Sequence, residues 1–137
     1  MRAIIIYSGE SKTIEAIVQA MGSSIQAMGH EVQKVKAQKS TRVESLFLYD
    51  LVYVGSPVLG FWGGKFSEPL ASYLRKCSGL EGKKVAVFVI PKLFGVSKAL
   101  KRIMKLLEEK GSIIIAFQSI KKPSEARDFG KRLSTAR

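Results

Sequence analysis

The sequence predicts an α/β domain, in which a five-stranded parallel sheet lies between two layers of helices as a three-layer sandwich. Five apolar runs recur along the 137 residues, and amphipathic stretches with helical spacing separate them. Strict alternation of strands and helices is typical of parallel sheets. A single domain over residues 1–137 is expected, because this length buries one sizeable core and the chain has no linker or low-complexity tract.

The strands are predicted from apolar residues, many of them β-branched. Four runs are nearly continuous, as expected of strands that are covered on both faces of a sheet: Ala3–Tyr7, Leu51–Gly55, Val85–Ile90 and Ile113–Phe117. The fifth run, Glu31–Lys36, has only Val32 and Val35 as apolar residues and therefore suits an edge strand.

The first two helices are predicted from apolar residues spaced three and four apart. Ser11 is a candidate N-cap for the first helix, and Gly29 a candidate stop. The second helix has Ser67 as its candidate cap and Pro69 in its first turn.

The later helices follow the same spacing. A third helix is expected to open at Ser97 and to end at Gly111, and a fourth follows Pro123. Between Ala37 and Asp50 the pattern is weaker, and a short helix is indicated there by three apolar residues: Val43, Leu46 and Phe47.

The chain is strongly basic, with 23 Lys and Arg against 11 Asp and Glu, a net charge of +12. Residues 92–137 hold 12 of the basic and 4 of the acidic residues, a net of +8. Such a surface attracts acidic proteins, nucleic acid or anionic small molecules, or is simply a solvated helix face. Nucleic-acid binding is not expected, because aromatic or glycine-rich readers do not accompany the charge.

Composition also limits the chemistry. Cys77 is the only cysteine and His30 the only histidine, so neither an intrachain disulfide nor a histidine-based zinc site or Ser-His-Asp triad is expected. Because no apolar run approaches the roughly 20 residues of a membrane helix, and the N-terminal run is too short for a signal peptide, no membrane association and a cytoplasmic location are expected.

Ligands of open parallel sheets bind beyond the carboxyl ends of the strands. The loop Ser8–Thr13, which reads SGESKT, offers three hydroxyl groups, a glycine, Lys12 and the N-terminus of a helix, a combination that can hold phosphate or simply cap the helix. The loop Ser56–Ser67 is long and rich in glycine, and it carries Phe61 and Trp62, which can stack on a flat ligand or cover the sheet.

The chain resembles the flavodoxin family over essentially its whole length. The resemblance rests on four stretches: YSGESKT, DLVYVGSPVLGFWGGKFSEPL, GLEGKKVAVFVI and GSIIIAFQSIKKPSEARDFGKRL. It implies a sheet of order 2-1-3-4-5, an order for which flavodoxin is itself a reference example. It also implies non-covalent FMN, with its phosphate on Ser8–Thr13 and its ring between the Ser56–Gly64 and Pro91–Val96 loops.

Carried over position by position, the resemblance implies phosphate contacts from Ser8, Ser11 and Thr13, and ring stacking by Trp62 and Phe94. The full set of expected cofactor-binding residues is Ser8, Gly9, Glu10, Ser11, Lys12, Thr13, Ser56, Pro57, Val58, Leu59, Gly60, Phe61, Trp62, Gly63 and Phe94. No residue is expected to act as a catalytic acid or base, and no metal site is expected.

Three features depart from the family pattern. Glu10 and Ser11 stand where the phosphate loop usually has Thr and Gly. A carboxylate about 4 Å from a phosphate costs about 4 kcal/mol per unit charge at an effective dielectric constant near 20, so Glu10 argues against FMN. Flavodoxins are typically acidic whereas this chain is basic, and the stretch PKLFGV lacks the acidic and small polar residues common at that place.

The residues therefore leave several functions open. The first is an FMN-binding electron carrier, and the second a flavin-dependent reductase, for which the chain has little room. The third is a flavodoxin-like binding module that has lost FMN and acts through partner binding, with a bare site or another anion. A receiver domain would need acidic residues where Tyr7, Ser8 and Gly55 stand. Whichever holds, an acidic protein partner is expected, and Lys98, Lys101, Arg102 and Lys105 form the candidate docking stripe.

Overall fold

The computed structural model describes residues 1–9, 11–60 and 63–134. Within these residues it contains five strands and four helices, in strict alternation except between the second and third strands. The elements are β1 (Arg2–Ser8), α1 (Lys12–Ala27), β2 (Glu31–Ala37), β3 (Leu51–Pro57), α2 (Glu68–Lys76), β4 (Lys84–Ile90), α3 (Val96–Glu109), β5 (Ile113–Ser119) and α4 (Pro123–Ser134). The strands pair in parallel in the order β2-β1-β3-β4-β5, which confirms the predicted fold class.

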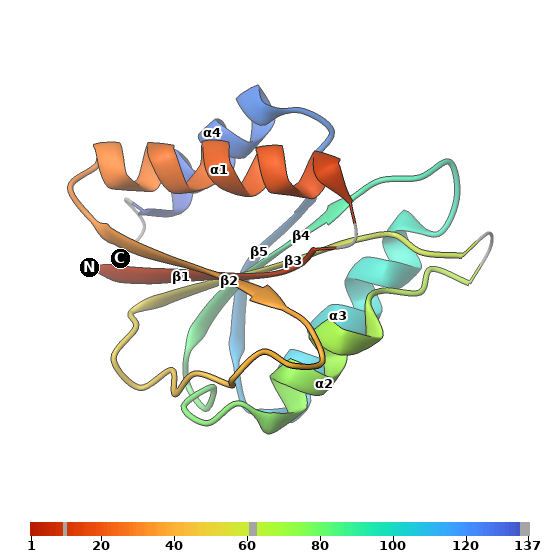
Figure 1. The fold of residues 1–137 in the computed structure, drawn as a ribbon, viewed down its shortest axis with the longest axis horizontal. Coiled ribbons are helices and arrows are strands. Elements are labelled where there is room, and N and C mark those ends of the chain that lie inside the picture. The colour runs from red at the N-terminus through yellow and green to blue at the C-terminus, as the bar shows by residue number, and fades with distance from the viewer. Residues whose placement is uncertain (10, 61–62, 135–137) are drawn as a thin grey trace.

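The sheet separates two layers of helices. In Figure 1, α1 and α4 cover one face and α2 and α3 the other. Because successive side chains of a strand point to opposite faces, β1 supplies Ile4 and Ile6 to the core under α2 and α3, and Ile5 and Tyr7 to the core under α1 and α4. Each face of the sheet therefore has its own apolar core. No helix of the described residues is long and apolar enough to cross a membrane.

The two edges of the sheet differ from its centre. Every residue of β3 is buried, whereas in β2 only Val35 and Ala37 are buried, and β2 lies at an edge of the sheet as predicted for Glu31–Lys36. The expectation that Ile113–Phe117 is covered on both faces is wrong. This run forms the edge strand β5, in which Ile113 is 53% and Phe117 59% exposed. A run of apolar residues therefore does not by itself show whether a strand lies at the centre or at the edge of a sheet.

Helix starts follow the predicted capping in two cases. The hydroxyl of Ser11 accepts hydrogen bonds from the backbone N–H groups of Thr13 and Ile14, and Ser67 accepts from Leu70. The predicted start of the third helix at Ser97 is wrong. This helix begins at Val96. Its N-cap is Gly95, which has a φ of 87° in the left-handed region and no side chain to cap the helix.

The short helix expected between residues 37 and 50 is also absent from the structure, which describes this whole segment as turns and extended chain. Leu46 is fully buried, but Phe47 next to it is 72% exposed. The Leu46 N–H donates to the carbonyl of Ser78, and the Glu44 N–H donates to the Tyr73 hydroxyl. These two backbone N–H groups are thus satisfied by α2 and the loop after it, without intrahelical bonds.

Gly55 in β3 serves packing within the core. A Cβ at this position would overlap the ring of Phe88, its pairing neighbour in β4. That ring is fully buried and meets Phe129 of α4 edge to face, with 6.4 Å between ring centroids. The glycine therefore gives Phe88 its space and fixes the approach of α4 to the sheet.

We predict that Gly55→Ala lowers the free energy of unfolding by about 1–3 kcal/mol, because the added methyl displaces a ring that has no free space beside it. Urea denaturation measures the change. Gly63→Ala is the matched control, since the nearest atom to its added Cβ is Lys65 Cγ at 3.9 Å. Adding Phe88→Leu to Gly55→Ala should recover part of the loss, and strict additivity of the two changes would contradict this account.

Candidate functional site

Three loops meet at the carboxyl edge of the sheet. They follow β1, β3 and β4, and Figure 1 shows all three projecting beyond the same ends of the strands. The loop after β1 leads into the N-terminus of the 16-residue helix α1. The structure therefore brings together the three segments that sequence reasoning selected, as expected for a parallel sheet.

Ser8 ends β1 directly below the first of these loops. Its side chain is fully buried, and among the described residues its Oγ has no hydrogen-bond partner. Buried hydroxyl groups are almost always paired, so an unpaired one at a helix N-terminus points to a ligand that would complete it. Ser11 has a second role that the sequence also indicated, because its Oγ caps α1. Lys12 and Thr13 are exposed in the first turn, and Glu10 lies outside the described residues.

Lys36 is a site residue that sequence reasoning missed. It stands near the end of β2, paired in register with Tyr7, and its side chain lies against the loop after β1. A Cβ on Gly9 would come within 2.9 Å of Lys36 Cε, so Gly9 leaves room for this side chain. The parallel register of two predicted strands is the signal that could have found it.

The ammonium group of Lys36 is held by a carboxylate of α1. Its Nζ lies 2.5 Å from Glu15 Oε1, and the Tyr7 hydroxyl donates to Glu15 Oε2 over 3.0 Å. The hydrogen bond from Lys36 is the main cause that lowers the pKa of Glu15, while burial and then Glu15 raise the pKa of Tyr7 to about 12. A cation, paired with Glu15, is thus positioned beside the loop after β1.

The loop after β3 is a tight hairpin. Leu59 and Lys65 exchange backbone hydrogen bonds of 2.7 and 3.2 Å, and the Val58 N–H donates to the Ile90 carbonyl. Ser56, Pro57 and Val58 are buried at its base, and the Ser56 hydroxyl donates to the Pro57 carbonyl and accepts from the Ser67 N–H. These predicted site residues therefore build the hairpin. Leu59, Gly60 and Gly63 lie further out, and Phe61 and Trp62 are outside the described residues.

The hairpin is seated on the start of α3. A Cβ on Gly64 would lie 2.6 Å from the Gly95 carbonyl oxygen and 2.8 Å from the Ala99 nitrogen, so this contact requires glycine. The hairpin and the loop after β4 are thereby joined at their bases. Beyond this junction the loop after β4 exposes two apolar side chains, Phe94 at 46% and Leu93 at 88%. Phe94 was expected at the site, whereas Leu93 was not singled out.

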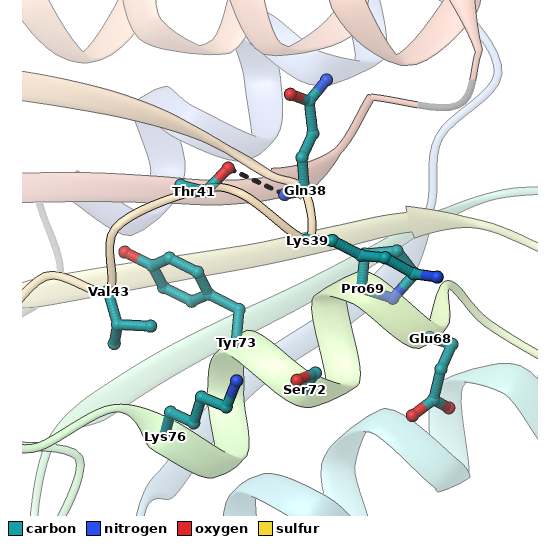
Figure 2. Close-up of a pocket in the computed structure, with 9 residues that line it drawn as sticks. All are labelled: Gln38, Lys39, Thr41, Val43, Glu68, Pro69, Ser72, Tyr73 and Lys76. Carbon is teal, nitrogen blue, oxygen red and sulfur yellow. Dashed lines mark hydrogen bonds between the residues drawn. The ribbon is translucent and has the colours of Figure 1, made fainter.

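A separate cavity of about 310 Å³ lies between the segment after β2 and helix α2 (Figure 2). Its hydrogen-bonding groups hold that segment in place, since Thr41 Oγ1 accepts from the Gln38 N–H and donates to the Lys36 carbonyl. The lining residues are Gln38, Lys39, Thr41, Val43, Glu68, Pro69, Ser72, Tyr73 and Lys76. The hydrogen bonds of Thr41 hold the end of β2 that carries Lys36.

Comparison with solved structures identifies the fold family that this chain resembles. The Streptococcus pneumoniae TIGR4 flavodoxin superposes with a TM-score of 0.76 at 13% identity, over 98% of both chains. Flavodoxin 2 from Bacillus cereus gives 0.75 at 23% identity, over 98% of this chain and 95% of that one. The chain has the flavodoxin fold. The two-electron reduced flavodoxin of Megasphaera elsdenii agrees, with a TM-score of 0.71 at 21% identity over 99% of this chain and all of that one. No protein-family model and no curated protein sequence matches the chain.

The described residues of this flavodoxin-fold chain offer no candidate metal site. No group of three or more His, Cys, Asp or Glu side chains among them could hold a metal ion. Cys77 follows α2, faces the core and is 4% exposed, and burial raises the pKa of its thiol to about 12. His30 lies at the opposite edge of the sheet, where its Nδ1 is 3.2 Å from the N-terminal nitrogen.

We predict that Cys77 in the folded protein reacts with dithiobis(nitrobenzoate) at pH 8 at least about a thousandfold more slowly than Cys77 in the unfolded chain. With a pKa of about 12, the thiol supplies very little thiolate at that pH, and its burial blocks access. The appearance of thionitrobenzoate is followed by absorbance, with and without denaturant. Rapid stoichiometric labelling of the folded protein would contradict a core role for this cysteine.

Proposed function

We propose that this protein binds FMN non-covalently and serves as an electron carrier. The observation that carries the proposal is the buried, unpaired hydroxyl of Ser8 at the N-terminus of α1, since a phosphate oxygen would complete it. The fold supports the proposal, because the three loops that would hold FMN stand together at one edge of the sheet.

The described residues fit the parts of FMN. Ser8, Ser11 and Thr13, with the free N–H groups of the first turn, would hold the phosphate. Lys12 would offset its charge, and Lys36, which is paired with Glu15, would lie beside the loop. Leu59, Gly60 and Gly63 of the hairpin, with Phe94, would flank the ring. FMN, when bound, supplies the redox chemistry, and the protein orients it and excludes water.

A second candidate rests on Glu10. A carboxylate in the phosphate loop favours a module that keeps the fold but has lost FMN, with a bare site or a different anion, and that acts through partner binding. The two candidates differ in one measurable property, the affinity for FMN.

FMN titration into the apoprotein tests the proposal. We expect saturable quenching of FMN fluorescence with one FMN per chain. Glu10→Thr should bind FMN at least about tenfold more tightly, because it removes the repulsion between a carboxylate and the phosphate that the lysines leave uncompensated. Glu31→Thr, which removes a carboxylate at the opposite edge of the sheet, is the control. Unquenched fluorescence from both the wild type and Glu10→Thr would leave the second candidate.

Ser8→Ala separates ligand binding from folding. Removal of an unpaired buried hydroxyl should leave the free energy of unfolding unchanged or raise it by up to about 1 kcal/mol. The same change should weaken FMN binding about five- to tenfold by the loss of one phosphate hydrogen bond, and should leave riboflavin binding unchanged. Ser112→Ala is the matched control, since Ser112 Oγ donates to the Leu80 carbonyl and should affect stability alone. Equal losses for FMN and riboflavin in Ser8→Ala would place the hydroxyl away from the phosphate.

A further inference from the structure

Helix α3 presents a row of positive charge to solvent. Lys98, Lys101, Arg102 and Lys105 are all exposed and fall at i, i+3, i+4 and i+7, a single face about 10 Å long. These four residues are called the α3 basic stripe. The opposite face of the same helix is buried against the sheet through Ala99, Leu100, Ile103 and Leu107. The stripe is therefore fixed in orientation on a rigid element.

The stripe is electrostatically unfavourable for the isolated protein. Among the ion pairs that the described residues form, none includes a member of the stripe. Like charges three and four residues apart repel one another. Lys98 also lies in the first turn, where the helix dipole is positive.

The other helices have an acidic residue near their positive N-terminal end, and α3 does not. Each of α1, α2 and α4 carries a glutamate in its first turn, namely Glu15, Glu68 and Glu125, whereas α3 has no acidic residue there. Its N-cap, Gly95, also provides no side-chain hydrogen bond. A local arrangement that costs stability without compensation in the free protein is typical of a functional surface.

An exposed apolar contact lies beside the stripe. Leu93, 88% exposed, stands two residues before the α3 N-cap on the loop after β4, and Lys92 beside it is exposed as well. The surface thus combines an apolar projection with four cations next to the loop that would flank the ring. Protein–protein docking sites combine a desolvated apolar centre with a charged rim in this way.

We propose that the α3 basic stripe and Leu93 form the docking surface for an acidic protein, with carboxylates facing the stripe and an apolar recess for Leu93. The binding part of this inference stands on charge and exposure alone. The further statement that the partner exchanges electrons rests on the proposed function, because the surface adjoins the loop assigned to the ring.

Other anionic partners fit less well. A bilayer takes up the apolar face of an amphipathic helix, and that face of α3 is buried in the core. Single-stranded nucleic acid requires several aromatic platforms along a basic groove, whereas the stripe is a convex helix face about 10 Å long with one aromatic residue, Phe94, beside it among the described residues.

Two charge-reversed variants of equal net charge test the proposal. The first variant, K98E/K101E/K105E, alters the stripe. The second, K121E/K122E/R127E, alters exposed positions at and before α4, on the other face of the sheet. Each variant lowers the net charge from +12 to +6. The probe is the acidic haem domain of cytochrome b5, with basic cytochrome c as its opposite, and binding to the flavin-free protein is followed by chemical-shift titration. Because the protein contains no flavin in this experiment, its result does not depend on FMN binding. A failure of the docking proposal can therefore be told apart from a failure of the FMN proposal.

We expect the wild type to bind cytochrome b5 with an affinity that falls at least tenfold from about 20 to about 200 mM salt. The stripe variant should lose at least tenfold at low salt, while the α4 variant should stay within about threefold of the wild type. The shifts should map to α3 and Leu93, and Leu93→Ser should weaken binding further. The thermal midpoint of the stripe variant should stay close to that of the wild type. A glutamate at position 98 is favourable at the positive end of the helix dipole, whereas a glutamate at position 105 is repelled by Glu108 and Glu109.

Equal losses in both triple variants would reduce the effect to net charge and overturn the proposal. So would an absence of salt-sensitive binding, or a marked fall in the thermal midpoint of the stripe variant, which would give the stripe a structural role. Phosphatidylserine vesicles and single-stranded DNA form the last arm. Stripe-dependent binding to either that is tighter than binding to cytochrome b5 would assign the surface to that class of partner.

Discussion

Burial of β1, β3 and β4 on both faces is the constraint on which the rest of the structure depends. Strands that bury both faces need helices on each side, and their parallel pairing places every carboxyl end at the same edge. The three loops of the candidate site meet there as a consequence. The same burial sets the local packing, since Phe88 fills the space above Gly55 and reaches Phe129 of α4.

Charge is distributed around this scaffold in two different ways. At the loop after β1, the cation of Lys36 is balanced by Glu15, and Tyr7 holds that carboxylate in place. This network is only partly buried, so it adds little to stability and serves mainly to position the ammonium group. On α3 the cations are unbalanced among the described residues and solvent-exposed. The first arrangement is a neutral ion pair beside the loop after β1, whereas the second leaves net positive charge on the surface that we propose for an acidic partner.

The candidate site was predictable where a local pattern carries it. Ser8–Thr13 follows a strand and opens a helix, and both the cap by Ser11 and the proximity of the loops follow from that order. Three features could not be predicted locally. Lys36 reaches the loop through the register of β2 against β1, Gly64 meets Gly95 across two loops, and Ser56 turns its hydroxyl to Ser67. Each depends on residues that are distant in sequence, whose distance only packing decides.

The alternation of apolar runs and amphipathic helices determined the fold class, the parallel sheet and the edge at which the candidate loops meet. Hydrophobic burial sets these features through the spacing of apolar residues within each segment of the chain. Tertiary structure decided which apolar run became an exposed edge, that residues 38–50 form no helix, and that α3 begins at Val96 after Gly95. These outcomes depend on competition between alternative partners for the same backbone groups and the same apolar surface. Such competition is resolved only when the whole chain is packed, since each hydrogen bond or buried contact formed in one place is no longer open to another.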